Sequence, residues 1–210
     1  MEKKKKGKPL IEQSTKPDIV VDIDEVLADS LHAMLKWYNQ KYHTNFEWKK
    51  CYTYKLWNVF NTSKEENALR FNKFFEECNL ETIRPVEGSQ EGIDRIHKIA
   101  NIHVVTGRND GQIEYTKSWL KKHFHEKFSS IEFTSHYYTE KPVKKSEVCK
   151  RLNAKIIIED DLEHAIDCAN HGVKVILLNR PWNQTAENKD IIRVDSWEEI
   201  VKTIGKLLKK

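Results

Sequence analysis

The sequence contains no apolar run near the roughly 20 consecutive residues that a membrane-spanning helix needs. Its lysine-rich start is not followed by the apolar segment of a secretory signal. Cysteine is sparse, and its positions show neither the spacing of zinc ligands nor that of a disulfide framework. These positions are Cys51, Cys78, Cys149 and Cys168. We therefore expect a soluble, cytoplasmic protein with reduced thiols and no membrane partner.

An excess of charge of one sign is also missing. The 36 lysines and arginines nearly balance the 32 acidic residues, which leaves a formal net charge of +4. Much of this excess lies in the lysines at positions 3–6 and 8, so the rest of the chain is close to neutral. A near-neutral domain offers no basic surface for nucleic acid, which we do not expect as a partner. We predict that residues 1–17 form a basic, disordered tail, with nucleic-acid binding by this tail as the alternative.

The chain does contain a regular alternation of short β-branched runs and longer amphipathic stretches. The runs that predict strands are 19–23, 102–106, 131–134, 155–158, 174–178 and 191–194. The stretches that predict helices are 88–100, 112–123, 143–152, 162–170 and 196–208. This alternation is typical of the α/β class. We predict a three-layer, doubly wound parallel sheet with helices on both faces.

One gap between strands is too long for an ordinary crossover connection. About 80 residues separate the first predicted strand from the second, and residues 30–84 are helical in pattern and rich in aromatic residues. We predict that residues 30–84 form a small helical cap inserted after the first strand. The α/β core then comprises residues 18–29 and 85–210. Most cap aromatics are expected to pack against one another, and a minority to line a pocket.

Polar residues follow several of the predicted strands directly. Asp22 and Asp24 end the first strand, Thr106–Arg108 end the second, and Glu159–Asp161 end the fourth. In an extended chain, residues i and i+2 lie on the same side, so the first two carboxylates are expected together. Taken alone, this pair fits a solvated loop equally well. Because the carboxyl ends of parallel strands meet at one edge of a sheet, the ordered set predicts a single site there.

These residue types suit phosphoryl transfer, in which negative charge must be met by a cation, a lysine and hydrogen-bond donors. We expect Asp22 to attack phosphorus and form an aspartyl-phosphate, and Asp24 to protonate the leaving group and then activate water. The candidate metal ligands are Asp22, Asp24 and Asp160. Since all of them are carboxylates, Mg²⁺ is the expected cofactor.

Three further residues are expected to bind the substrate phosphate. Thr106 and Gly107 supply hydrogen-bond donors, and Lys145 offsets negative charge. Arg108 either holds phosphate or sugar, or pairs with a neighbouring acid. Asp161 is expected to cap the following helix rather than to bind metal.

Four groups of residues resemble the motifs of the haloacid dehalogenase (HAD) superfamily of phosphotransferases: Asp22 with Asp24, Thr106–Arg108, Lys145, and Glu159–Asp161. The likeness extends from residue 19 to the end of the chain. The segments 22–29, 104–108, 147–152, 157–160 and 177–183 are most similar to its 5′-nucleotidase C-type, or 5′(3′)-deoxyribonucleotidase-like, branch. The resemblance implies Mg²⁺-dependent hydrolysis of nucleoside monophosphates, with a cap that encloses the base. Trp37, Tyr38, Trp57 and Phe71 are candidates to stack on that base. A phosphatase for another small ester, such as a sugar phosphate or phosphoglycolate, is the alternative.

The chain departs from this family pattern at two places. Glu25 stands where many members have glycine, which adds a carboxylate near the phosphate. The acidic block begins with Glu159 rather than aspartate, so we assign the direct metal contact to Asp160. The catalytic lysine is Lys145 by its spacing, with Lys144 and Lys141 as alternatives. A phosphate-accepting receiver domain fits less well, because its acidic pair would precede the acceptor strand.

Overall fold

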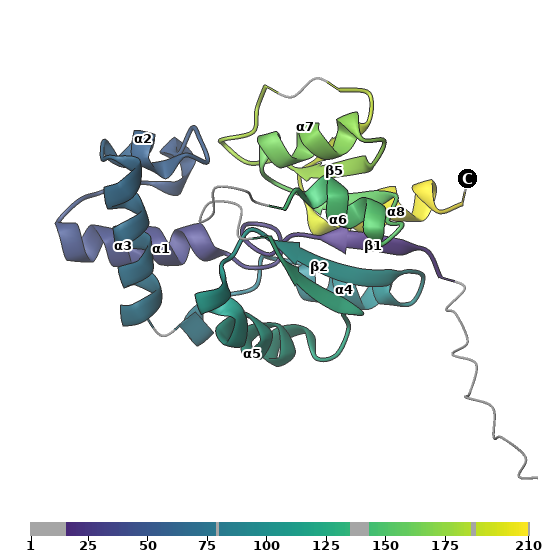
Figure 1. The fold of residues 1–210 in the computed structure, drawn as a ribbon, viewed down its shortest axis with the longest axis horizontal. Coiled ribbons are helices and arrows are strands. Elements are labelled where there is room, and N and C mark those ends of the chain that lie inside the picture. Colours follow the sequence, from purple (N-terminus) through teal and green to yellow (C-terminus); the bar gives the residue numbers. More distant parts are fainter. Residues whose placement is uncertain (1–15, 79, 135–142, 186–187, 210) are drawn as a thin grey trace, which may run out of the picture.

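The computed structural model describes residues 16–78, 80–134, 143–185 and 188–209, and the expectations for residues 1–15 and Lys141 lie outside these ranges. Six strands form a single sheet in the order β3-β2-β1-β4-β5-β6, and every pairing is parallel (Figure 1). The strands are β1 (Asp18–Val21), β2 (Asn101–Thr106), β3 (Ser130–Phe133), β4 (Ile156–Glu159), β5 (Lys174–Leu178) and β6 (Ile191–Val194). The central strand β1 pairs with β2 on one side and β4 on the other.

Helices cover both faces of this sheet, as predicted. They are α4 (Ser89–His97), α5 (Ile113–Phe124), α6 (Lys145–Arg151), α7 (Leu162–Asn170) and α8 (Trp197–Leu207). Side chains of α4, α5 and α8 pack with Val21 on one face, and those of α6 and α7 pack with Val20 on the other. Successive strand residues point to opposite faces, so β1 supplies both cores. The three-layer, doubly wound α/β prediction is confirmed.

The long connection from β1 to β2 carries its own helices. These are α1 (Ser30–Tyr42), η1 (Trp48–Lys50), α2 (Leu56–Phe60), α3 (Lys64–Glu77) and η2 (Leu80–Thr82). In Figure 1, α1, α2 and α3 lie together to one side of the sheet. Tyr38 is fully buried among them, with its ring 4.2 Å from that of Phe60 and 5.8 Å from that of Phe46. Aromatic packing therefore holds the cap segment together, as we expected.

The first strand is shorter than its sequence pattern predicts. It ends at Val21, and the Ile23 carbonyl then accepts hydrogen bonds from the backbone N–H groups of Leu27 and Ala28, both at 2.8 Å. Glu25 lies in this turn with a positive φ of 60°, a conformation that few non-glycine residues adopt. The apolar run predicts an extended chain through Ile23, but local turn hydrogen bonds end the strand at Val21. Within the described ranges, no helix has the length and apolar character needed to cross a bilayer.

Candidate active site

Four buried ionisable groups converge at the carboxyl edge of the central strands. Asp22 follows β1 directly, and its backbone N–H donates to the Ile158 carbonyl at 3.0 Å. Glu159 ends β4, and Asp160 follows it. Because β1 and β4 are parallel neighbours, these three carboxylates share one edge. Lys145, the first residue of α6, completes the group, and all four residues are at most 4% exposed.

Lys145 links two of these carboxylates. Its Nζ donates to Asp22 Oδ1 at 2.7 Å and to Glu159 Oε2 at 2.8 Å. Burial would lower the pKa of Lys145, but the two carboxylates outweigh it and raise that pKa, so the side chain is an ammonium. The neighbouring Lys144 points elsewhere and pairs with Asp167 at 3.1 Å. The structure therefore brings Lys145, and not Lys144, to the site.

The carboxylates of Asp22, Glu159 and Asp160 form a group suited to a metal ion. Each offers one oxygen, and the three oxygens lie within 4.8 Å of one another. Asp160 Oδ2 accepts a hydrogen bond from Trp182 Nε1 at 2.9 Å, whereas the buried Oδ1 has no partner among the described residues. A buried acceptor without a partner is unfavourable, and a cation would satisfy it. An all-oxygen donor set fits a hard divalent ion such as Mg²⁺.

Charge balance supports the same assignment. Three ionised carboxylates and one ammonium leave two unbalanced negative charges in a buried space, and one divalent cation would neutralise them. Burial raises the pKa of Asp22, that of Asp160 well above its usual range, and that of Glu159 to about 8. A bound cation would return these groups to the ionised form that metal ligation requires.

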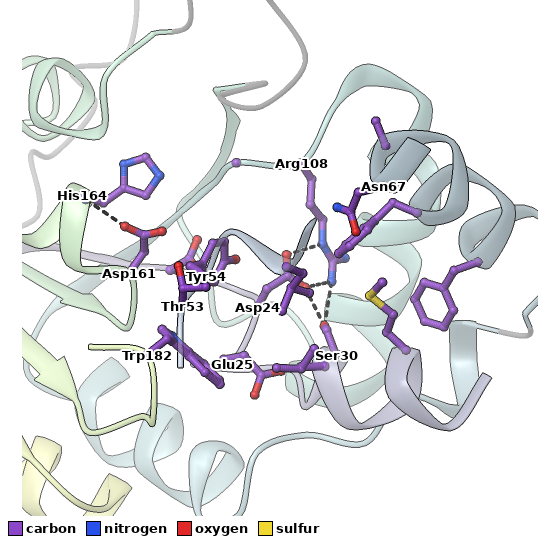
Figure 2. A pocket seen from close by; sticks show the side chains of 18 of the residues that line it. Asp24, Glu25, Ser30, Thr53, Tyr54, Asn67, Arg108, Asp161, His164 and Trp182 are labelled. Atoms are coloured by element: carbon purple, nitrogen blue, oxygen red, sulfur yellow. Dashed lines mark hydrogen bonds and ion pairs between the residues drawn. The ribbon is translucent and has the colours of Figure 1, made fainter. Parts of the chain in front are cut away.

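Asp24, which we expected beside Asp22 as a metal ligand, engages a different partner. Its carboxylate accepts from Arg108 Nε at 3.0 Å and from Arg108 Nη2 at 2.6 Å, and Ser30 Oγ donates to it at 2.5 Å (Figure 2). It does not belong to the three-carboxylate group described above. The shared side expected for residues i and i+2 requires an extended chain, and the chain leaves the strand at Val21.

The environment of Asp24 favours its ionised form. Burial alone would raise the pKa of this carboxyl, but the charge and hydrogen bonds of Arg108 outweigh burial and hold the pKa below its usual value. Arg108 is itself 3% exposed, and its Nη1 donates to Thr116 Oγ1 at 3.0 Å. Of the two roles considered for Arg108, the structure shows the pairing with a neighbouring acid.

The other predicted phosphate-binding residues lie at the same edge. Thr106 ends β2 and is fully buried, and its Oγ1 accepts from the Arg108 backbone N–H at 3.3 Å. Gly107 lines the pocket described next. Asp161 caps α7, since its Oδ1 accepts from the backbone N–H groups of Glu163 at 2.7 Å and His164 at 3.1 Å. Its predicted role as a cap is confirmed.

A pocket opens between this edge and the cap (Figure 2). Trp57 and Phe71 are among its lining residues, as proposed for stacking. Tyr38 is not, because it is fully buried in the aromatic packing of the cap. Trp37 also lies outside the lining, and its indole N–H donates to Glu77 at 3.1 Å. The expectation that Tyr38 stacks on a ligand is therefore wrong.

The side chain of Glu25 faces the cap rather than the carboxylates of Asp22, Glu159 and Asp160. Its side chain accepts from the backbone N–H of Leu31, at the start of α1, at 2.6 Å and from Trp48 Nε1 at 3.1 Å. Burial raises its pKa to about 7. Its own carbonyl accepts two hydrogen bonds from Arg180, at 2.5 and 3.1 Å. Glu25 thus connects the turn after β1 to the cap and to the loop after β5.

Sequence reasoning missed two contacts of the acidic residues. The first is the hydrogen bond from Ser30 Oγ to Asp24. Ser30 was not among the candidate residues, although it begins α1 and follows Asp24 by six positions. Trp182 lies in the segment 177–183, which served only for the family resemblance, yet its indole N–H donates to the Asp160 side chain. An indole in a loop that follows a strand at this edge was the available signal.

Comparison with known proteins agrees with this geometry. The family model described as "5' nucleotidase, deoxy (Pyrimidine), cytosolic type C protein" matches residues 16–209. A nucleotidase of Clostridium acetobutylicum is 24% identical over 196 residues, covering 92% of this chain and 96% of the relative.

Two solved structures share the fold. A haloacid dehalogenase-like hydrolase of Streptococcus pneumoniae has a TM-score of 0.66 at 12% identity and covers 90% of this chain and 98% of its own. The HAD-type protein YfnB of Bacillus subtilis, solved with magnesium bound, has a TM-score of 0.61 at 17% identity over 91% of this chain and 99% of its own. With the family match spanning nearly its whole length, the chain belongs to the cytosolic type C 5′-nucleotidase family, on a HAD-like fold.

Proposed function

We propose that this protein is a Mg²⁺-dependent phosphomonoesterase that hydrolyses nucleoside monophosphates through an aspartyl-phosphate on Asp22. The observation that carries the proposal is the contact of Lys145 Nζ with both Asp22 and Glu159, beside the unpartnered Oδ1 of Asp160. A nucleophile, a fixed positive charge and a metal-binding group then stand together in one buried site. Membership of a nucleotidase family supports the substrate class.

In the first step, a carboxylate oxygen of Asp22 attacks phosphorus and forms a new O–P bond. The ester P–O bond breaks, and protonated Asp24 gives its proton to the departing alkoxide. Lys145 remains charged and offsets the negative charge of the phosphoryl oxygens. Thr106 ends β2 at the same edge and Gly107 lines the pocket, and in this proposal the Thr106 hydroxyl and the Gly107 backbone N–H would donate hydrogen bonds to those oxygens.

In the second step, ionised Asp24 takes a proton from water. The resulting hydroxide oxygen bonds to phosphorus, the Asp22 O–P bond breaks, and inorganic phosphate leaves. Asp22 is regenerated as a carboxylate, and Asp24 is again protonated. Arg108 favours the ionised state of Asp24 and therefore assists this second step.

Asp22 and Asp160 would hold the Mg²⁺ ion, with Glu159 beside them. When bound, the ion would screen the negative charges of carboxylate and phosphate from each other. The family description names pyrimidine deoxynucleotides, which makes thymidine and deoxyuridine 5′-monophosphates the first substrates to test. Trp57 and Phe71 supply aromatic faces in the pocket against which a base can stack.

A phosphate-release assay tests the proposal. Nucleoside monophosphates are compared with sugar phosphates and phosphoglycolate, with Mg²⁺ and with a chelator. We expect release from nucleotides only with Mg²⁺, and a loss of at least about 10³-fold for Asp22→Asn. Asp94→Asn is the matched control, because Asp94 is an exposed residue paired with Lys127. Wild-type turnover by Asp22→Asn, or a preference for sugar phosphates over nucleotides, would contradict the proposal.

A further inference from the structure

Asn67 places an unsatisfied amide in the wall of the pocket. It lies in the first turns of α3 and is 7% exposed. Its side-chain Oδ1 is fully buried and has no hydrogen-bond partner within the described parts of the chain. Asn67 also lines the pocket that contains Asp22 and Lys145. A buried carboxamide oxygen without a donor is unfavourable, so its presence in a ligand pocket calls for a donor from the ligand.

Helix formation does not explain this asparagine. Asparagine is a poor helix former, and the cap of α3 is already provided by Ser63, whose side chain accepts from the Glu66 N–H. The Asn67 backbone N–H donates to the Ser63 carbonyl at 3.0 Å in the ordinary helical manner, and this leaves the carboxamide without a local role. An apolar residue would suit the helix and its buried setting better.

The neighbours of Asn67 on α3 define what it can contact. Lys64, Phe71 and Phe74 also line the pocket, and their spacing from Asn67 along α3 places them on the same side of the helix. Asn67 is therefore a neutral polar group between a lysine at the start of α3 and an aromatic surface further along the helix. The aromatic surface suits a flat, uncharged ring with a polar edge.

The phosphate end of a substrate has its own place. Lys145 and the carboxylates of Asp22, Glu159 and Asp160 lie at the sheet edge, whereas Asn67 belongs to the cap. Figure 2 shows Asn67 on one side of Asp24, and Asp161 with His164 on the opposite side. A substrate with its phosphate at the sheet edge can thus extend its other end along α3.

We propose that Asn67 is a specificity-determining residue that reads the edge of the nucleobase. Its Oδ1 accepts a hydrogen bond from a ring N–H or amino group, and its Nδ2 donates to the adjacent carbonyl or ring nitrogen. A fixed donor beside an acceptor on the edge of a flat ring is a property of nucleobases that sugar phosphates and simple aryl phosphates lack. This inference rests on the proposed nucleotidase function and adds the residue that recognises the base.

A comparison of substrates in one variant and its control tests the inference. The variant is Asn67→Leu, which keeps the approximate side-chain size and removes both polar atoms. The control is Thr62→Val, because Thr62 Oγ1 is also buried without a partner but Thr62 does not line the pocket. The substrates are thymidine 5′-monophosphate, its N3-methyl analogue, and p-nitrophenyl phosphate, which has no base.

For Asn67→Leu, we expect the ratio of kcat/KM for thymidine 5′-monophosphate to that for p-nitrophenyl phosphate to fall about 10- to 100-fold, mainly through KM. The wild-type protein should disfavour the N3-methyl analogue, and the variant should lose this discrimination. Thr62→Val should keep the wild-type ratios. If Asn67→Leu does not fold, Asn67→Ala replaces it, and competition by free thymidine against p-nitrophenyl phosphate gives a second readout.

Wild-type ratios in the Asn67 variant, with the N3-methyl analogue still disfavoured, would overturn the inference while leaving nucleotidase activity intact. Wild-type protein that hydrolyses p-nitrophenyl phosphate but none of the nucleoside monophosphates would overturn the proposed function, and the inference with it. The two failures are distinguished by the wild-type measurement alone.

Discussion

Arg108 holds the carboxylate of Asp24 with two hydrogen bonds, from Nε to Oδ2 at 3.0 Å and from Nη2 to Oδ1 at 2.6 Å. This two-point contact between planar groups is strong and directional. It lowers the pKa of the residue that we propose to protonate the leaving group. The pair therefore favours the base form of Asp24, which the second step needs, over the acid form, which the first step needs.

The first prediction concerns Arg108→Met. Without the guanidinium, burial raises the pKa of Asp24, so the basic limb of the kcat/KM profile should move to higher pH. Loss of the charged hydrogen bonds should also lower the free energy of unfolding by about 2 to 3 kcal/mol. A pH–rate profile with Mg²⁺ in excess and a denaturant titration measure the two effects.

Arg151→Met is the control for this variant. Arg151 pairs with Glu132 at 3.1 Å, but its side chain is 59% exposed, so its removal should change stability by no more than about 0.5 kcal/mol. Its pH–rate profile should match that of the wild type. An unchanged basic limb in Arg108→Met would mean that Asp24 is not the proton donor.

The second prediction separates two adjacent lysines. Lys145→Met removes the ammonium from between Asp22 and Glu159, so we expect kcat to fall at least about 100-fold. Lys144→Met removes only an exposed pair with Asp167 and should retain wild-type kcat. Phosphate release under saturating substrate measures both. A large loss of kcat in Lys144→Met would reassign the catalytic role to Lys144. A large loss in Lys141→Met, with Lys145→Met still active, would reassign it to Lys141.

The sheet and the position of its acidic edge could be predicted from sequence because both depend on local patterns. The three isoleucines at positions 156–158 predict a buried strand. The polar residue that ends this strand, Glu159, must then lie at the carboxyl edge of the sheet. Parallel pairing then brings Asp22 and Glu159 to the same edge. Only the parallel direction of the strands, and not their order in the sheet, had to be assumed.

Side-chain partners could not be predicted in the same way. Trp182 contacts Asp160 across 22 positions, and nothing in the periodicity of either segment indicates that contact. Tyr38 and Phe71 are both cap aromatics, yet one is buried among rings and the other lines the pocket. Which side of a helix faces the pocket depends on how α1, α2 and α3 pack, and this is tertiary information.

The third prediction concerns stability in the absence of metal. Burial raises the pKa of Glu159 to about 8, and those of Asp22 and Asp160 are raised too, so the folded state binds more protons than the unfolded state above about pH 4. The free energy of unfolding should therefore fall as pH rises from about 5 to about 8. Asp24, with its lowered pKa, contributes its pH dependence only below this window.

Mg²⁺ should oppose this loss of stability, because it binds the ionised carboxylates and protons compete with it. We expect an excess of Mg²⁺ to raise Tm by roughly 5 to 10 °C at about pH 8, and by less at about pH 5. Thermal melts with Mg²⁺ and with a chelator give the comparison. Asp160→Asn should abolish the rise in Tm that Mg²⁺ causes. A wild-type Tm that does not respond to Mg²⁺ at either pH would count against a metal site.

The fourth prediction is that Trp182 orients a metal ligand. Its indole N–H holds Asp160 Oδ2 at 2.9 Å and leaves Oδ1 for the ion. Trp182→Phe keeps the ring but removes the donor, so Mg²⁺ affinity measured by calorimetry should fall about 10- to 100-fold. Trp119→Phe is the control, because its indole donates to the Ile83 carbonyl outside the pocket. This control should lose stability with unchanged affinity, and an equal loss of affinity in both variants would show that Trp182 acts only through packing.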